Sequence, residues 1–257
     1  MIETEVKLKG KKNIAKGIFC FEFETSNNLP DIVPGQFVNL SIPNRPDLIL
    51  KRPFGIMDFD KQKNTFKIAF AVVGEGTKSL SAMKAGEKIN ATIPLGNGFS
   101  INFFNKRVVL VGGGSGIFPL YSMKNYPELE LYSFLGYKNK ESSFLTSEFN
   151  DISKEVYISS DDGTIGEKGF ITDILEQKID GICPDLVLAC GPSNMLKALK
   201  KIILKRHIIT QVSIEERMGC GIGACLVCAC KILENNKISN KRACFDGPVF
   251  NINEVIF

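Results

Sequence analysis

The stretch at residues 217–244 reads RMGCGIGACLVCACKILENNKISNKRAC, and the rest of the chain is interpreted from it. Cys220, Cys225 and Cys228 are separated by four and then two residues, and Cys244 follows after a further fifteen. Two irons with two bridging sulfides need four thiolates around one small volume, and plant-type [2Fe-2S] sites use this spacing. Glycines between the first cysteines suit a tight loop whose amides point at sulfur. The stretch therefore predicts a [2Fe-2S] cluster held by these four cysteines.

Two other interpretations of the same cysteines stay open at this point. Four thiols that include one C-x2-C pair can hold structural zinc, although zinc sites usually combine two short-spaced pairs. Disulfides would need an oxidising compartment, and the first residues, MIETEV, lack the basic and apolar regions of a secretory signal. Cys230 lies two residues after Cys228 and fits the alternation of a strand. We expect it in the core or beside the cluster rather than as a ligand.

The composition is that of an ordinary globular protein with about two domains and a small extra module. The chain has 257 residues, of which 44% are hydrophobic and 23% charged, and its formal net charge is +4. This charge is too small to predict a nucleic-acid or membrane surface, and no apolar run is long enough for a transmembrane helix. We therefore expect a cytoplasmic protein whose eight cysteines are reduced thiols or metal ligands.

The first part of the chain, residues 1–100, is predicted to be a β-domain. Alternating or apolar runs lie at residues 18–24, 35–42, 66–73 and 89–93, with Pro and Gly between them. Several short strands at this spacing predict an antiparallel barrel or sandwich.

Two motifs in this part can bind phosphate. Arg52-Pro53-Phe54-Gly55 follows a strand-like run, and Gly74-Glu75-Gly76-Thr77 precedes an expected helix through Met83. An arginine beside a glycine-rich turn at a helix start is a suitable clamp for a diphosphate. Taken singly, a surface arginine and an ordinary turn explain the two motifs equally well.

Together with PLGNGF at residues 94–99, these motifs resemble the flavin domain of the ferredoxin-reductase family. The resemblance implies a six-stranded antiparallel barrel that binds FAD. It assigns FAD contacts to Arg52, Pro53, Phe54, Gly55, Gly74, Gly76 and Thr77. Many relatives have Ser where this chain has Gly55, so the contact there has to come from the backbone.

The second part, residues 101–212, alternates strands with helices. Apolar runs at residues 107–111, 129–134, 156–159, 185–190 and 210–214 have the character of buried parallel strands, and residues 193–204 form the clearest helix. This alternation predicts a doubly wound parallel sheet, in which ligands bind at the carboxyl ends of the strands.

Two glycine-bearing strand ends lie in this part, GGGSG at residues 112–116 and Cys-Gly-Pro at residues 190–192. The first does not match G-x-G-x-x-G, and tight strand–helix packing explains such a turn as well as a nucleotide does. In the ferredoxin-reductase family, however, a turn and a strand end of these two types form the nicotinamide-nucleotide site. The resemblance assigns NAD contacts to Gly113, Gly114, Gly116, Cys190, Gly191 and Pro192.

A pair of acidic residues follows another predicted strand. Asp161 and Asp162 either meet the adenosine ribose or form a solvated turn. Negative charge there would disfavour a 2′-phosphate, so the pair favours NAD over NADP.

The third part, residues 213–257, is expected to be the cluster module. Residues 216–228 and 242–250 closely resemble the electron-transfer subunits of dihydroorotate dehydrogenase B, and the resemblance covers essentially the whole chain. The resemblance implies a complex with an FMN-containing catalytic subunit, which oxidises dihydroorotate. The complex would contain two copies of each chain. Electrons would pass through the cluster and FAD to NAD+ in pyrimidine biosynthesis, and no residue of this chain is expected to act on dihydroorotate.

Two rival functions remain. Subunits of NAD(P)H:ferredoxin or sulfide oxidoreductases share the flavin and nucleotide domains, but usually vary the ligand near the first cysteine. A zinc-stabilised binding module without redox chemistry is the rival of a different class.

Overall fold

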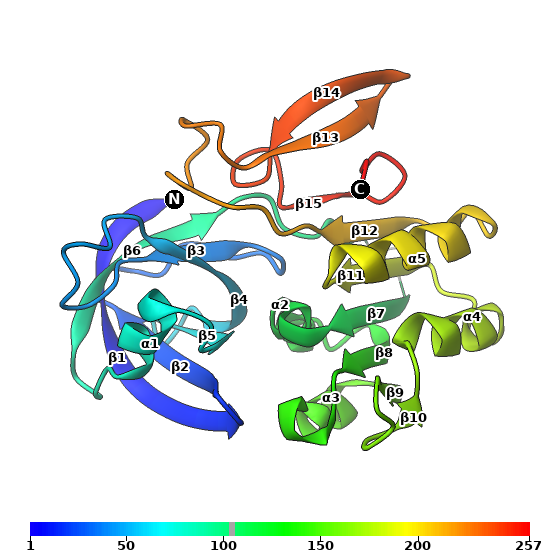
Figure 1. The fold of residues 1–257 in the computed structure, drawn as a ribbon, viewed down its shortest axis with the longest axis horizontal. Coiled ribbons are helices and arrows are strands. Elements are labelled where there is room, and N and C mark those ends of the chain that lie inside the picture. The colour runs from blue at the N-terminus through cyan, green and yellow to red at the C-terminus, as the bar shows by residue number, and fades with distance from the viewer. Residues whose placement is uncertain (103–105) are drawn as a thin grey trace.

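The computed structural model describes residues 1–102 and 106–257, and these form three parts (Figure 1). A β-barrel with the N-terminus lies beside an α/β part. A small hairpin module made by the last segment of the chain sits above both. The longest described helices have 12 residues, and none within the described ranges is long and apolar enough to cross a membrane.

The barrel is closed by six antiparallel strands in the order β1-β2-β5-β4-β3-β6. Their bounds are Ile2–Ala15, Ile18–Thr25, Phe37–Leu40, Arg52–Asp60, Thr65–Ala71 and Lys88–Leu95 for β1 to β6, and α1 spans Glu75–Ser81. Alternate residues point inward and form an apolar core of Phe, Leu, Ile and Val side chains. The predicted antiparallel barrel is thus confirmed.

The α/β part contains a seven-stranded sheet with the order β10-β9-β8-β7-β11-β12-β15. The strands are Arg107–Gly113 (β7), Glu130–Tyr137 (β8), Glu155–Ser160 (β9), Glu167–Lys168 (β10), Leu186–Cys190 (β11), Thr210–Ser213 (β12) and Val249–Asn251 (β15). The helices are Ile117–Leu120 (α2), Thr146–Ile152 (α3), Ile171–Ile182 (α4) and Ser193–Leu204 (α5). All strand pairs are parallel except β12 with β15.

Alternation along β7 explains why both faces of this sheet are covered. Val109 and Val111 pack in one apolar cluster with α4 and α5, whereas Val108 and Leu110 pack in another with α2 and α3. The second cluster also contains Met57 and Ala69 of the barrel. The sheet is therefore doubly wound, as predicted, and one of its faces is joined to the barrel.

The C-terminal module is a two-stranded hairpin, Ala229–Glu234 (β13) and Lys237–Arg242 (β14), preceded by the cysteine loop. The chain then returns to the sheet, where β15 pairs antiparallel with β12. On the way, Asn97 of the barrel donates its backbone N–H to the carbonyl of Gly247 at 2.6 Å. The module is consequently tied to both other parts of the chain.

Two local expectations need correction. Arg52 does not follow a strand but begins β4, and residues 41–51 before it contain only turns and a bend. The helix after Gly74 ends at Ser81, before Met83. The helix after the glycine-rich turn has four residues, since α2 lies between the short 3-10 turns Gly114–Gly116 and Tyr121–Asn125.

Candidate cofactor sites

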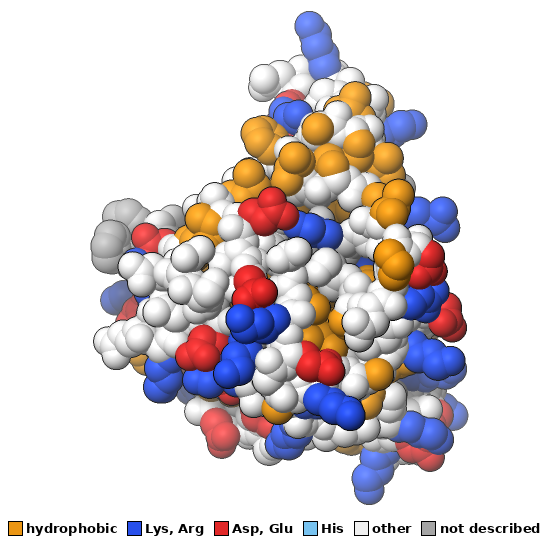
Figure 2. Space-filling view, turned by 90° about the vertical axis from the view of Figure 1, so that its left-hand side faces the viewer, with side chains coloured by type: hydrophobic (Ala, Val, Ile, Leu, Met, Phe, Trp, Pro, Cys, Tyr) orange, Lys and Arg blue, Asp and Glu red, His pale blue; other side chains and the backbone are white. Residues whose placement is uncertain are grey.

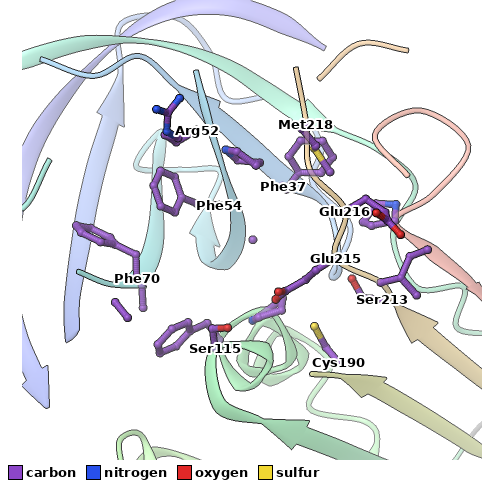
Figure 3. A pocket seen from close by; sticks show the side chains of 18 of the residues that line it. Phe37, Arg52, Phe54, Phe70, Ser115, Cys190, Ser213, Glu215, Glu216 and Met218 are labelled. Atoms are coloured by element: carbon purple, nitrogen blue, oxygen red, sulfur yellow. The ribbon is translucent and has the colours of Figure 1, made fainter. Parts of the chain in front are cut away.

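A cavity of about 380 Å³ lies where the barrel meets the α/β part (Figure 3). Barrel strands β3, β4 and β5 form one side, the turn before α2 forms another, and the segment after β12 closes a third. Its lining includes Arg52, Pro53, Phe54, Gly55, Thr77, Phe37, Phe70, Ser115, Pro119, Cys190, Glu215 and Met218. Five of the seven residues assigned to FAD from the sequence therefore line one cavity.

The guanidinium of Arg52 is fixed beside the start of α1. Its Nη1 donates to the carbonyl of Leu50 at 2.5 Å. A Cβ at Gly76 would lie only 3.1 Å from its Nε, so glycine leaves room for the guanidinium against the helix. No carboxylate within the described residues forms an ion pair with Arg52, in contrast to Arg45, which pairs with Asp47 and Glu75. Arg52 thus offers an uncompensated positive charge and free donors to an anion.

The remaining residues of the two motifs shape this place rather than offer side chains to a ligand. The hydroxyl of Thr77 accepts from the backbone N–H groups of Val73 and Gly74 at 2.9 and 3.1 Å and donates to the carbonyl of Gly74. A Cβ at Gly55 would lie 3.2 Å from Cβ of Pro119, so glycine lets the barrel approach the turn of the α/β part. Gly74 and Gly76 do not line the cavity themselves.

Sequence reasoning missed Glu215, which enters the cavity from the segment after β12. Figure 3 shows its carboxyl reaching toward Ser115, with Cys190 nearby. Removal from water raises the pKa of the Glu215 carboxyl above its usual value. The signal was present in the sequence, because Glu215 directly follows the apolar run at residues 210–214, and ligands bind at the carboxyl ends of such strands.

A second cavity, of about 470 Å³, lies at the carboxyl ends of β7, β8 and β9. Its lining contains Gly113, Gly114, Pro192, Asp161, Asp173, Lys138, Phe170 and Met195. Three of the six residues assigned to NAD thus meet here. Phe170 is 68% exposed at the rim, where its ring is available to a flat ligand.

The other three residues assigned to NAD have different surroundings. Cys190 lines the first cavity, and its burial raises the pKa of the thiol to about 12, so the thiol stays neutral. A Cβ at Gly116 would lie 2.2 Å from the carbonyl oxygen of Cys190, and one at Gly191 would lie 3.0 Å from the backbone nitrogen of Gly113. Gly116 and Gly191 therefore let the turn pack against the end of β11.

The two acidic residues Asp161 and Asp162 have different surroundings. Asp161 lines the second cavity. Asp162 instead accepts hydrogen bonds from the backbone N–H and the hydroxyl of Thr164 at 2.9 and 2.7 Å. Of the pair, Asp161 alone lines this cavity.

The four cysteines of the loop gather as two pairs. The backbone N–H of Cys220 donates to Sγ of Cys225 at 3.3 Å, and that of Cys225 donates back to Sγ of Cys220 at 3.4 Å. Sγ of Cys228 lies 3.2 Å from Sγ of Cys244. Each iron of a [2Fe-2S] cluster takes two thiolates, so two pairs fit two irons.

Backbone amides surround these sulfurs. Ile222 donates its N–H to Sγ of Cys220 at 3.5 Å, and Gly223 donates to Sγ of Cys244 at 3.2 Å. Desolvation opposes ionisation of Cys220, but the amide donors lower its pKa to about 6, so it is a thiolate near neutral pH. Burial raises the pKa of Cys244 to about 12, so this thiol loses its proton only when metal binds.

The arrangement of these cysteines in two pairs favours two metal ions over the single position of a tetrahedral zinc site. Among the described residues, no three His, Cys, Asp or Glu side chains converge on a single metal position. Cys230 is buried on β13, and its Sγ donates to the carbonyl of Lys241 at 3.4 Å. It belongs to the hairpin core and is not a fifth ligand.

Comparison with known proteins gives a consistent result. A family model described as the iron-sulfur cluster binding domain of dihydroorotate dehydrogenase B matches residues 215–256. The electron transfer subunit of dihydroorotate dehydrogenase B (NAD(+)) from Caldanaerobacter subterraneus subsp. tengcongensis is 42% identical over 256 residues, 99% of each chain. The corresponding subunit of Desulforamulus reducens is 35% identical, over 95% of this chain and 94% of the relative.

Solved structures agree on the fold. The structure of an NADH-dependent reduced ferredoxin-NADP oxidoreductase has a TM-score of 0.85 and 29% identity, covering 97% of this chain and 89% of that one. The ferredoxin reductase of carbazole 1,9a-dioxygenase has a TM-score of 0.70 at 17% identity, covering 80% and 66%, and this likeness is one of fold alone.

Proposed function

The chain belongs to the family of electron-transfer subunits of dihydroorotate dehydrogenase B, and we propose which of its residues hold the cofactors and the partner. It is an oxidoreductase subunit of pyrimidine biosynthesis that uses FAD, a [2Fe-2S] cluster and NAD. Electrons pass through it from an FMN-containing catalytic subunit to NAD+. When bound, FAD exchanges two electrons with NAD(H) and single electrons with the cluster.

One observation supports this route most directly, namely the nearness of the flavin cavity to the cluster loop. Met218 lines the cavity, and Cys220, two positions along the chain, is the first cysteine of the cluster loop. Two residues of chain span at most about 7 Å. The protein therefore holds both cofactors close enough for electrons to pass without a diffusing carrier.

Each cofactor is assigned its own residues. Arg52 binds the FAD diphosphate, while Pro53, Phe54 and Gly55 lie along the flavin. Gly113, Gly114 and Pro192 offer backbone to the NAD diphosphate, and Asp161 meets the adenosine ribose. The cluster ligands are Cys220, Cys225, Cys228 and Cys244. The backbone at Gly74, Gly76, Thr77, Gly116 and Gly191 shapes the two nucleotide sites, and Cys190, which lines the flavin cavity at the end of β11, would contact the nicotinamide.

The catalytic subunit docks where the cluster reaches the surface. Figure 2 shows hydrophobic side chains gathered on the upper part of one face, over the module and the adjoining barrel. Ile222, Leu226, Val227 and Phe245 of the module and Ile49 and Leu50 of the barrel are between 46% and 85% exposed. An apolar surface of this kind around an electron-transfer group fits a stable protein partner.

The parts of the chain correspond to three units, with FAD at residues 1–100, NAD at residues 101–212 and the cluster at residues 213–257. The third unit also completes the sheet of the second through β15. We place the protein in the cytoplasm, because all eight of its cysteines are free thiols and four of them serve as metal ligands.

Anaerobic titration with NADH tests the assignment of cofactors. Purified protein should contain FAD, two irons and two sulfides per chain, and NADH should bleach the flavin and then reduce the cluster. A colourless chain with one zinc would contradict the proposal.

A further inference from the structure

One buried polar group has no partner. Asn39 lies on β3 and is 1% exposed, and its side-chain oxygen Oδ1 accepts no hydrogen bond from the described residues. Such an acceptor weakens the fold, because it has lost its contact with water without gaining a donor. An unpartnered buried polar group in a folded protein needs an explanation, and a functional role can supply one.

Asn39 points away from the barrel interior. Its neighbours Val38 and Leu40 belong to the core inside the barrel, so alternation sends Phe37 and Asn39 to the outer face. Phe37 packs in the same apolar cluster as Cys228 and Cys244. The outer face of β3 is therefore covered by the cluster module.

The amide of Asn39 contacts the loop beside the first cluster cysteine. A Cβ on Gly221 would lie 2.5 Å from Nδ2 of Asn39 and 3.3 Å from its Cγ. Gly221 has a φ of +74°, which also favours glycine, and it stands directly after Cys220. The loop approaches Asn39 this closely only because position 221 has no side chain.

Asn39 itself does not line the flavin cavity, but two of its neighbours do. In the pairing of β3 with β4, Asn39 lies opposite Pro53, and Pro53 and Phe37 both line that cavity. Asn39 consequently stands between the strands that border the flavin and the loop that carries the cluster.

We propose that Asn39 is a positioning residue that joins the flavin-binding barrel to the cluster loop, its side-chain amide holding the backbone around Gly221. The proposal rests on the function proposed above. A half-turn of the amide exchanges its oxygen and nitrogen ends, so Asn39 can offer either an acceptor or a donor to the loop. Fixing Gly221 also fixes the next amide, Ile222, which donates to Sγ of Cys220 at 3.5 Å. Hydrogen bonds to the sulfurs set the potential of a cluster, so Asn39 acts on both the distance and the potential of electron transfer.

The test compares Asn39→Ala and Asn39→Leu with wild type in the chain loaded with FAD and cluster. Leucine keeps much of the side-chain size without either amide end, whereas alanine removes the side chain. Ser239→Ala is the matched control, because Ser239 Oγ is also buried and unpartnered among the described residues but lies on β14. Stopped-flow spectroscopy follows flavin reduction by NADH and then cluster reduction, and an EPR-monitored redox titration gives the midpoint potential.

Both Asn39 variants should keep NADH-to-flavin transfer within about twofold, slow flavin-to-cluster transfer roughly tenfold and shift the midpoint potential. Ser239→Ala should match wild type in all three measurements. An Asn39→Leu protein with wild-type transfer and potential would overturn the proposal, since packing alone would then suffice. If Asn39→Leu fails to fold, Asn39→Ala decides, and an unchanged rate and potential in that variant would overturn it. A wild-type chain that lacks the cluster would instead defeat the proposed function.

Discussion

Sγ of Cys228 and Sγ of Cys244 lie 3.2 Å apart although they are 16 positions apart in the sequence. The hairpin explains this nearness, because β13 begins directly after Cys228 and β14 ends two residues before Cys244. Ala243 closes the arrangement by donating its N–H to the carbonyl of Cys228 at 2.9 Å. The fold of the hairpin therefore brings two of the four proposed cluster ligands together.

Replacing one loop cysteine should remove the cluster and leave the flavin working. In Cys225→Ser the pair with Cys220 is broken, so we expect loss of the [2Fe-2S] absorption and EPR signals. NADH should still bleach the flavin at a rate within about twofold of wild type, because the flavin cavity does not contain Cys225.

Cys230→Ser is the control for this experiment, since Cys230 donates to Lys241 and belongs to the hairpin core. It should retain both signals. Cluster loss in Cys230→Ser, or cluster retention in Cys225→Ser, would show that the ligands are assigned wrongly.

Arg52→Ala should weaken FAD binding by about 10- to 100-fold, because a hydrogen-bonded charge on the diphosphate is lost. Arg45→Ala is the matched variant, since Arg45 lies near the same helix but is already paired with Asp47 and Glu75. FAD affinity of the two variants can be measured by fluorescence titration of the flavin-free chain. Equal losses in both would mean that Arg52 does not contact the diphosphate.

Much of this arrangement is readable in the sequence, and the limits have physical causes. Strands with apolar runs, such as β7 and β11, were predicted within a few residues, because burial on both faces leaves an unmistakable pattern. Strand β1 was missed, because only its first half alternates exposed Glu3, Glu5 and Lys7 with inward Thr4, Val6 and Leu8, while residues 9–13 read KGKKN and show no apolar pattern.

Contacts between distant segments were harder to predict than strands. No local sequence pattern predicts that Asn97 bonds to Gly247, that β15 pairs with β12, or that Asn39 contacts Gly221. Glycine motifs point to close approach but not to its partner, as at Gly55 beside Pro119 and at Gly116 beside the carbonyl of Cys190. The cysteine spacing was informative because metal chemistry fixes it independently of the fold.

Gly116→Ala should destabilise the fold by about 2–4 kcal/mol, because the new Cβ would collide with the carbonyl of Cys190. Gly114→Ala meets nothing within 4 Å and should cost about 1 kcal/mol for its φ of +52°. The free energy of unfolding of both variants can be measured by urea unfolding, followed by circular dichroism. A larger loss of unfolding free energy in Gly114→Ala than in Gly116→Ala would contradict the close packing of Gly116 against Cys190.

Asp161→Asn should change nucleotide preference. Loss of the carboxylate charge weakens the hydrogen bonds from the ribose and removes the charge that repels a 2′-phosphate, so KM for NADH should rise about tenfold and NADPH should become a better substrate. In Asp162→Asn the Oδ1 that caps Thr164 is kept, so the preference should not move. A shift in Asp162→Asn alone would reverse the assignment of the pair.

Glu215 should make stability depend on pH. Its folded-state pKa is raised above the usual 4.5 by loss of water, so the folded chain holds this proton more tightly than the unfolded chain. The advantage is complete below the unfolded pKa and is lost as pH rises through the folded pKa. Wild type should therefore lose stability relative to Glu215→Gln in urea unfolding as the pH rises from below 4.5 through the raised pKa of Glu215. A difference that grows in the opposite direction would contradict the burial of this carboxyl.

The most direct test of the whole account is an anaerobic pull-down of the tagged chain, assayed for dihydroorotate-dependent reduction of NAD+. We expect an FMN-containing subunit to co-purify and the complex to form NADH. A complex built on Cys225→Ser should pass electrons from dihydroorotate only as far as the FMN of the partner subunit, without forming NADH. A co-purifying complex that passes electrons from NADH to ferredoxin or a sulfur compound, but does not oxidise dihydroorotate, would contradict the account.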